Sequence, residues 1–122
     1  MSLILVVEDQ DYLRKLTERM LKQGGHDVLA VGSGKEAVGV CKETTVDLVI
    51  TDLAMPDMDG IELIRSLRNS HPDLPILAMS GTFTGHFLKI ATTLGAVGTL
   101  EKPFRQGDLL AMVNESTGKQ TA

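Results

Sequence analysis

Five short apolar segments recur along this 122-residue chain, and each is followed by polar residues and then by a longer segment of mixed polarity. Val, Leu and Ile are frequent in these segments, whose length and composition are typical of strands buried on both faces of a parallel sheet. The predicted strands cover residues 3–7, 27–31, 46–51, 75–79 and 97–100. The pattern therefore predicts the strands of a parallel sheet.

In the intervals after these strands, apolar residues return every three or four positions, as on one face of an amphipathic helix. Asp11 and Ser33 are candidate caps for the first two helices, and Gly24-Gly25 is a stop signal after the first. The predicted helices cover residues 12–23, 35–43, 61–69, 83–94 and 106–114. Such alternation predicts an α/β (βα)5 fold, with a doubly wound parallel five-stranded sheet and helices on both of its faces.

The length of the chain fits one domain with a hydrophobic core of its own. Hydrophobic residues make up 43% of the sequence and charged residues 23%, as in ordinary soluble globular proteins. No linker or internal repeat divides the sequence. We expect a single domain over residues 1–122, with its core from about residue 3 to 115 and a polar tail over 116–122.

The formal net charge of −4 argues against direct binding to nucleic acid or to an anionic membrane, because both favour a basic surface. Cys41 is the single cysteine, so no internal disulfide can form, and a reducing compartment is the default. No apolar run approaches the roughly 20 residues that span a bilayer, and no secretory signal precedes the first strand. We therefore expect a cytoplasmic location.

Polar side chains follow four of the five predicted strands at their carboxyl ends, namely Glu8, Asp9, Asp52, Ser80 and Lys102. If the strand order is 2-1-3-4-5, the first and third strands are neighbours at the switch point where open α/β sheets bind ligands. Three carboxylates would then crowd together, and a cation must offset their mutual repulsion. Hard oxygen ligands of this kind select Mg²⁺, with Mn²⁺ as the alternative.

Each of these residues also has a purely structural interpretation. Asp52 is either a nucleophile, a metal ligand or a cap for the turn that follows it. Glu8 and Asp9 fit the start of the turn into the first helix, and Ser80 fits a turn or cap position. Lys102 alone is uninformative, because most lysines lie at the solvated surface. Their joint placement at one edge of the sheet favours a functional site.

Four motifs occur in the same order as in the receiver domain of two-component response regulators, which the chain resembles from Leu3 to about Asn114. They are Glu8-Asp9, Asp52 followed by LAMPDMDG, Ser80-Gly81, and Lys102-Pro103-Phe104. Each motif is weak alone, but the ordered set at four strand ends is specific. The resemblance implies a flavodoxin-like fold and a phosphorylation switch in a two-component phosphorelay.

The resemblance assigns Asp52 as the phospho-acceptor, with a sensor histidine kinase or a histidine phosphotransfer domain as the donor. It implies that Asp9, Asp52 and the backbone carbonyl of Ala54 bind Mg²⁺, and that Glu8 acts mainly through a metal-bound water. An ionised aspartate needs no base to attack phosphorus, and phosphoryl transfer depends mostly on positioning and charge stabilisation. The only chemistry expected of the chain is its own phosphorylation and dephosphorylation.

The resemblance further implies that Lys102 pairs with the phosphoryl oxygens and that Ser80 donates a hydrogen bond to one of them. It also implies a cis peptide bond between Lys102 and Pro103. Thr99 departs from the family pattern, which usually has Tyr or Phe at this switch position. We therefore expect the signal to pass mainly through the loop after Ser80, toward an output partner that binds the fourth helix, fifth strand and fifth helix.

Two other classes of protein compete with this interpretation. A Mg²⁺-dependent phosphatase of the haloacid-dehalogenase type also uses an aspartate nucleophile, but it needs a second Asp where this chain has Ala54. A receiver-shaped interaction module that works without phosphorylation would not need Glu8, Asp9, Asp52, Ser80 and Lys102 together. Whether the domain is free-standing or part of a larger protein stays open.

Overall fold

A computed structural model describes residues 2–53, 60–81, 89 and 91–117, and it confirms the predicted (βα)5 sheet architecture. The strands are β1 (Leu3–Val7), β2 (Asp27–Val31), β3 (Leu48–Asp52), β4 (Ile76–Ser80) and β5 (Gly98–Glu101). The helices are α1 (Asp11–Gln23), α2 (Gly34–Glu43), α3 (Gly60–Ser70) and α5 (Gln106–Ser116). Within the described ranges, no helix is long and apolar enough to cross a membrane.

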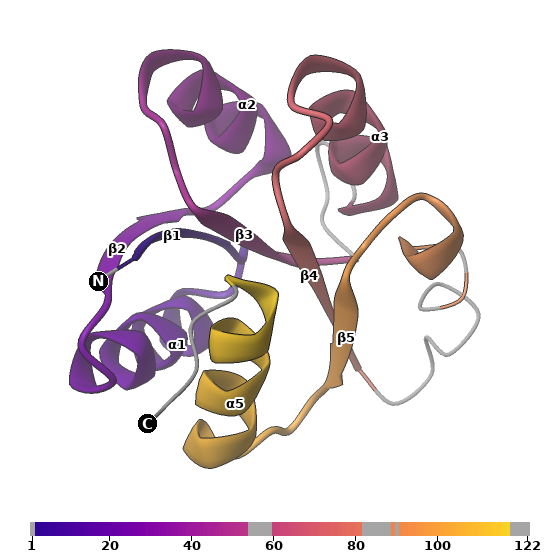
Figure 1. The fold of residues 1–122 in the computed structure, drawn as a ribbon. Helices are drawn as coiled ribbons and strands as arrows, with labels where there is room; N and C mark the ends of the chain where they lie inside the picture. Colours follow the sequence, from indigo (N-terminus) through magenta and orange to yellow (C-terminus); the bar gives the residue numbers. More distant parts are fainter. Residues whose placement is uncertain (1, 54–59, 82–88, 90, 118–122) are drawn as a thin grey trace.

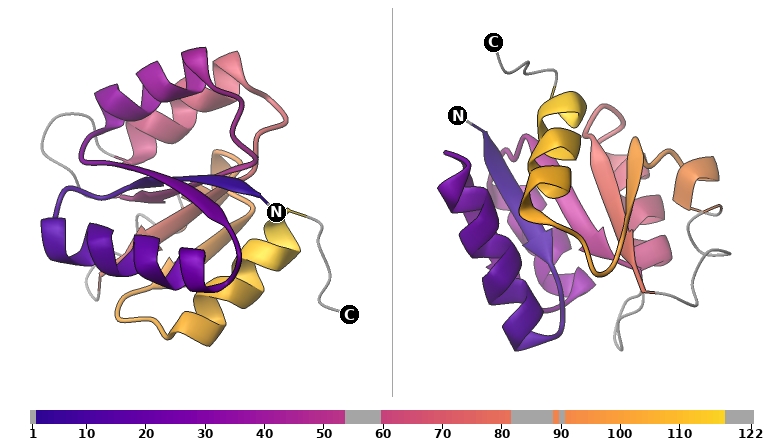
Figure 2. Two further views of the ribbon diagram at one scale, coloured as in Figure 1. Left: turned by 90° about the vertical axis from the view of Figure 1, so that its left-hand side faces the viewer. Right: turned by 90° about the horizontal axis from the view of Figure 1, so that it is seen from below.

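All pairings in the sheet are parallel, and the strand order is β2-β1-β3-β4-β5, as predicted. Helices α2 and α3 cover one face of the sheet, and α1 and α5 cover the other (Figures 1 and 2). Strand β1 pairs with β2 on one side and with β3 on the other, which makes the β1–β3 border the switch point. Ligands of open α/β sheets bind at this point, beyond the carboxyl ends of the strands.

Two separate hydrophobic cores, one on each face of the sheet, explain why the strands are apolar at successive positions. Side chains alternate along a strand, so Leu5 and Val7 pack toward α2 and α3, whereas Ile4 and Val6 pack toward α1 and α5. All four side chains are fully buried. A strand with both faces covered has no solvent-facing position, and this removes the polar alternation of a half-exposed sheet.

The structure corrects several predicted strand boundaries. β3 begins at Leu48 and not at Val46, and Asp52 and Ser80 are the last residues of β3 and β4, although the sequence had placed them after the strands. The parallel ladder continues past these residues, because Leu53 donates to the Met79 carbonyl at 3.1 Å. Backbone pairing does not depend on side-chain polarity, and the apolar pattern therefore marked the strand ends too early.

The cap predictions have mixed outcomes. Ser33 caps α2 as predicted, since its hydroxyl oxygen accepts a hydrogen bond from the Glu36 amide at 3.2 Å. Asp11 is not the cap of α1: it is the first helical residue, and its side chain pairs with Arg14 one turn later. The predicted stop after α1 is confirmed, because Gly25 has a φ of 88°, a left-handed conformation that favours glycine.

The prediction for the fourth helix falls largely outside the described residues. Lys89 and residues 91–93 are helical, and the remainder of the predicted 83–94 segment is not described. Ala54, with its predicted metal-binding carbonyl, also lies outside the described residues.

Candidate functional site

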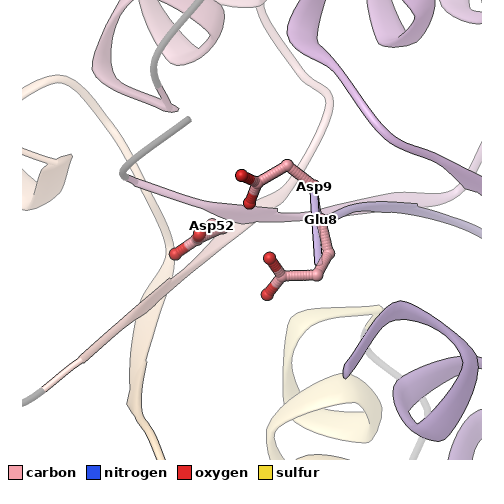
Figure 3. Close-up of side chains that lie close together, drawn as sticks. All are labelled: Glu8, Asp9 and Asp52. Atoms are coloured by element: carbon pink, nitrogen blue, oxygen red, sulfur yellow. The ribbon is translucent and has the colours of Figure 1, made fainter. Parts of the chain in front are cut away.

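Three carboxylates meet at the β1–β3 switch point. Oxygens of Glu8, Asp9 and Asp52 all lie within 4.8 Å of one another. Figure 3 shows the three carboxylates converging on one space at the carboxyl edge of the sheet. The sequence predicted this cluster, and the structure confirms that its members come together.

The sheet register explains the cluster. Val7 of β1 lies opposite Thr51 of β3, so the next residue on each strand is a carboxylate, Glu8 or Asp52. Parallel neighbours end at the same edge, which brings residues 44 positions apart in the chain side by side. Glu8 is fully buried and Asp52 is 7% exposed, whereas Asp9 is more accessible to solvent.

Lys102 is the cation that faces this cluster. Its ammonium nitrogen lies 2.6 Å from Glu8 Oε1 and 3.2 Å from Asp52 Oδ1. The sequence had predicted a position near Asp52, and the structure confirms it, but the shorter contact is with Glu8. Because its side chain is only 17% exposed, Lys102 interacts with both carboxylates where water screens charge weakly.

The burial of Glu8 has an electrostatic consequence. Burial raises the pKa of the Glu8 carboxyl above its ordinary value, the hydrogen bond from Lys102 opposes that rise, and the charge of Asp52 adds to it. A buried carboxylate without a partner is costly. The ion pair with Lys102 therefore offsets part of the cost of the cluster.

The Asp52 carboxylate is oriented by its own neighbours. Its Oδ1 accepts a hydrogen bond from the Leu53 amide at 3.0 Å and forms an ion pair with Lys102, whose Nζ lies 3.2 Å away. The Thr51 hydroxyl donates to the Asp52 backbone carbonyl at 2.9 Å. Among the described residues, Leu53 and Lys102 both contact Oδ1 of this carboxylate. These two contacts leave Oδ2 available to react.

Gly60, the first residue of α3, lies against the end of β3. Its amide donates to the Leu53 carbonyl at 3.0 Å, so α3 begins directly against the end of the strand. A Cβ atom on residue 60 would lie 2.2 Å from the Asp52 carbonyl oxygen and 2.6 Å from the Leu53 Cα. These atoms belong to the backbone and cannot turn aside, so only glycine fits this close approach.

Ser80 ends β4, and Lys102 directly follows the neighbouring strand β5 at the same edge of the sheet. The Lys102 amide donates to the Ser80 carbonyl at 2.7 Å, and the buried Ser80 hydroxyl donates to the Gly81 carbonyl at 3.1 Å. The peptide bond between Lys102 and Pro103 is cis, which confirms that prediction. The polar ends of β1, β3 and β5 therefore meet at the carboxylate cluster, and the end of β4 is joined to this edge through the backbone of Ser80.

Thr99, the predicted switch residue, lies opposite Ala78 in the pairing of β4 with β5. It is half-buried and borders a shallow hollow of about 450 Å³ together with Lys89, Thr92 and Thr93. The structure therefore places Thr99 on β5 beside the described helical residues that precede this strand.

Two supporting contacts were not predicted. The Gln10 amide donates to Glu8 Oε2 at 3.3 Å, and Arg14 Nη1 donates to the Glu8 carbonyl at 3.0 Å. Arg14 had been interpreted only as a helix residue. Periodicity carries no signal for a side chain that reaches back six residues to a backbone carbonyl.

The donor set fits a hard divalent cation. All three clustered groups are carboxylates, and the described cluster holds neither thiolate nor imidazole. Mg²⁺ favours such oxygen ligands and retains several waters, so the accessible position of Asp9 suits it.

Comparison with known proteins identifies one family over most of the chain. The family model for the response regulator receiver domain matches residues 4–114. The chain is 37% identical over 119 residues to sensor kinase CckA of Brucella abortus, covering 96% of this chain and 13% of that protein. It is 37% identical over 110 residues to response regulator protein FleR of Pseudomonas aeruginosa, covering 90% of this chain and 23% of that protein.

Solved structures agree with the family match. A response regulator receiver domain protein from Clostridium thermocellum has a TM-score of 0.93 at 26% identity, covering 97% of this chain and 95% of that one. Chemotaxis protein CheY4 of Vibrio cholerae has a TM-score of 0.89 at 27% identity, covering 95% of this chain and 98% of that one. The chain therefore belongs to the response regulator receiver domains, the phosphorylation-accepting signalling modules of two-component systems.

Proposed function

We propose that Asp52 is the residue of this receiver domain that accepts the phosphoryl group. The proposal is carried by the position of Lys102, whose Nζ lies 3.2 Å from Asp52 Oδ1 beside a buried acidic cluster. This arrangement supplies a carboxylate nucleophile together with a fixed positive charge for the phosphoryl oxygens. The chemistry of the chain is limited to its own phosphorylation and dephosphorylation.

The donor is a phosphohistidine of a sensor histidine kinase or of a histidine phosphotransfer domain. Asp52 Oδ2 attacks phosphorus, the new O–P bond forms as the P–N bond breaks, and the departing imidazole takes up a proton from water. A carboxylate nucleophile needs no general base. Lys102 stays close enough to pair with the transferred group.

Asp9, Asp52 and the Ala54 carbonyl would hold Mg²⁺, with Glu8 acting through a bound water. When bound, the metal supplies positive charge that offsets the negative charge of the transferring group. The chain's own carboxylates fix where that charge lies. Their mutual repulsion is then relieved, and this makes the loaded site more favourable than the bare acidic cluster.

We assign the output of the switch to Ser80. Its hydroxyl now donates to the Gly81 carbonyl and would turn to donate to a phosphoryl oxygen, worth about 1.5–3 kcal/mol for a charged acceptor. Thr99 is too small to replace an aromatic ring, so the signal passes through the loop after Ser80. The partner-binding face consists of the fourth helix, β5 and α5, on a domain whose core runs from about residue 3 to 115.

Mass spectrometry of the intact chain tests the acceptor. Incubation with a small-molecule phosphodonor and Mg²⁺ is expected to add one phosphoryl group to the wild-type chain and none to Asp52→Asn. Asp73→Asn is the matched control, because Asp73 is exposed in the loop between α3 and β4 at the opposite edge of the sheet. Equal phosphorylation of Asp52→Asn would show that another residue is the acceptor.

Amide shift mapping tests the output route. Addition of beryllofluoride, which mimics the phosphoryl group, is expected to shift Ser80, Gly81, Lys89 and Thr92 in the wild-type chain. These shifts should be absent in Ser80→Ala. A response confined to the neighbours of Asp52, with Lys89 and Thr92 unchanged, would contradict a route through Ser80.

A further inference from the structure

Asp9 lies in a short turn that joins β1 to α1 at the carboxyl edge of the sheet. Strand β1 ends at Val7, and α1 begins at Asp11. The residue before the helix, Gln10, makes no side-chain hydrogen bond to cap it. Asp9 is also more accessible to solvent than Glu8. Burial and helix capping therefore contribute little to the placement of the Asp9 carboxylate, which depends on the backbone of the turn.

Arg14 binds both ends of this turn. Its Nη1 donates to the Glu8 carbonyl at 3.0 Å, and its Nη2 donates to the Asp11 carboxylate. The five donors of a guanidinium are held in one planar fork, so two bonds made together restrict where their acceptors can lie. The Arg14 side chain is only 20% exposed, so its own position is restricted by the packing around it. Asp9, which lies between the two acceptors in the chain, is thereby held from both sides.

The loop after β2 also lies close to the guanidinium. Gly32 follows Val31, the last residue of β2, and a Cβ atom on residue 32 would lie 3.4 Å from Arg14 Nη1. The Glu8 amide donates to the Val31 carbonyl at 3.1 Å. The turn, the end of β2 and the start of α1 therefore meet at Arg14, and this restricts the guanidinium to the position from which it reaches the turn.

We infer that Arg14 is a positioning residue for the metal site: its guanidinium holds the turn that presents the Asp9 carboxylate to Asp52. Oxygens of Asp9 and Asp52 lie within 4.8 Å of each other, and Figure 3 shows both carboxylates facing one space. Arg14 acts through the backbone of the turn and is not itself a ligand. Because a positive charge by itself repels a cation, the contribution of Arg14 comes from the position that it gives Asp9. This role rests on the proposed binding of Mg²⁺ by Asp9.

The first test is a Mg²⁺ titration of the full chain without phosphodonor, followed by the amide NMR shifts of the site. Arg14→Gln is expected to weaken Mg²⁺ binding about tenfold, as is typical when a group that orients a metal ligand is lost. Charge alone predicts the opposite sign, since removal of a nearby cation would strengthen Mg²⁺ binding. Unchanged or tighter binding in Arg14→Gln would therefore overturn the inference.

Arg19→Gln is the matched control for the loss of one positive charge. Arg19 lies on the same helix and is exposed, so solvent and salt screen its charge from the site. This variant should change the dissociation constant of Mg²⁺ by less than about twofold. An equal weakening in Arg19→Gln and Arg14→Gln would overturn the inference, because the effect would then not depend on the contacts of Arg14.

The second test measures the turn itself, in the chain without Mg²⁺. Backbone order parameters from nitrogen relaxation are expected to fall at Asp9 and Gln10 in Arg14→Gln, from about 0.85, the value of rigid backbone, toward about 0.6. Ile50, fully buried in β3, is the internal control and should keep its value. A general loss of stability would not produce this local change. Unchanged order parameters at Asp9 and Gln10 would overturn the inference.

Arg14→Lys replaces Arg14→Gln if that variant does not fold. It keeps the positive charge, but its compact ammonium group cannot bind both acceptors in a fixed fork. Weaker Mg²⁺ binding then reports the lost bridge, and unchanged binding overturns the inference. If the wild-type chain binds no Mg²⁺, the proposed metal role of Asp9 fails, and the order parameters still decide whether Arg14 holds the turn.

Discussion

At the scale of single residues, the site places charge where the fold excludes water. Glu8 is fully buried and Asp52 nearly so, yet both face the same cation, Lys102. Charged groups are rarely buried unless they are paired, and each member of such a cluster constrains its neighbours. Gly60 constrains the site in another way: because it has no side chain, the start of α3 can lie against the backbone of Asp52.

Gly60→Ala is expected to destabilise the domain by about 2 kcal/mol, because the new Cβ meets backbone atoms that must move. Urea unfolding measures the loss. Gly39→Ala is the matched control, since residue 39 is exposed within α2 with open space around its Cβ position. That substitution should stabilise the domain by about 0.5–1 kcal/mol, because Ala favours helix more than Gly does. Effects of the same sign at both positions would contradict the steric explanation.

The buried Cys41 thiol is expected to make the stability of the domain fall as pH rises. Burial raises the pKa of its thiol above the ordinary value of 9.0, so the folded state keeps the proton more tightly than the unfolded state does. The contribution is fully present below the ordinary pKa and is lost as pH rises through the folded one. Wild-type stability should therefore fall more between about pH 7 and about pH 10 than that of Cys41→Ala. Parallel losses in urea unfolding would show that the thiol does not contribute.

At the scale of elements, the strands act as a frame, and the residues at and just after their carboxyl ends carry the chemistry. Each strand ends at the same edge of a parallel sheet, so its first polar residue arrives at a shared place. The helices cover this frame with their buried faces. Of the helix starts described above, α2 has a side-chain cap from Ser33, whereas α1 and α5 begin without one.

Ser33→Ala is expected to lower the free energy of unfolding by about 1 kcal/mol, because the Glu36 amide loses its acceptor. Thermal or urea unfolding measures the change. Ser116→Ala is the matched control. The Ser116 hydroxyl donates to the Met112 carbonyl within α5 and does not cap a helix start. Its removal should be nearly neutral. A larger loss from Ser116→Ala than from Ser33→Ala would contradict the importance of the cap.

At the scale of the whole molecule, two cores on opposite faces of one sheet couple the site to global stability. Any ligand that binds the folded carboxyl edge and not the unfolded chain raises the stability of the entire domain. The acidic cluster is the described feature that best suits a cation.

Mg²⁺ at ten times its dissociation constant is expected to stabilise the domain by about 1.4 kcal/mol, and the melting temperature should rise accordingly. Asp9→Asn should abolish most of this rise, because it removes the most accessible ligand of the cluster. Asp73→Asn, at the opposite edge of the sheet, should leave it intact. An equal rise in Asp9→Asn would place the metal elsewhere.

Local patterns in the sequence were sufficient to predict the strands, the helices and which charged residues come together at one edge of the sheet. Apolar runs, helical periodicity and the polar residues after the runs depend on neighbours in the chain, and they predicted the five parallel strands. With the strand order 2-1-3-4-5, they also predicted the convergence of Glu8, Asp9, Asp52 and Lys102. The ends of β1 and β2 were predicted correctly, whereas those of β3, β4 and β5 were placed one residue early, because backbone pairing does not depend on side-chain polarity.

The contacts inside the site depended on tertiary structure. The preference of Lys102 for Glu8, the hydrogen bond from Arg14 to the Glu8 carbonyl and the closeness of Gly60 to Asp52 join atoms whose separation is set by the packing of several elements. Sequence spacing determines which residues reach the same edge of a sheet, because strands end where pairing ends. It does not determine differences of a few tenths of an ångström in the distances between side chains, and such differences decide which carboxylate lies nearer to the lysine.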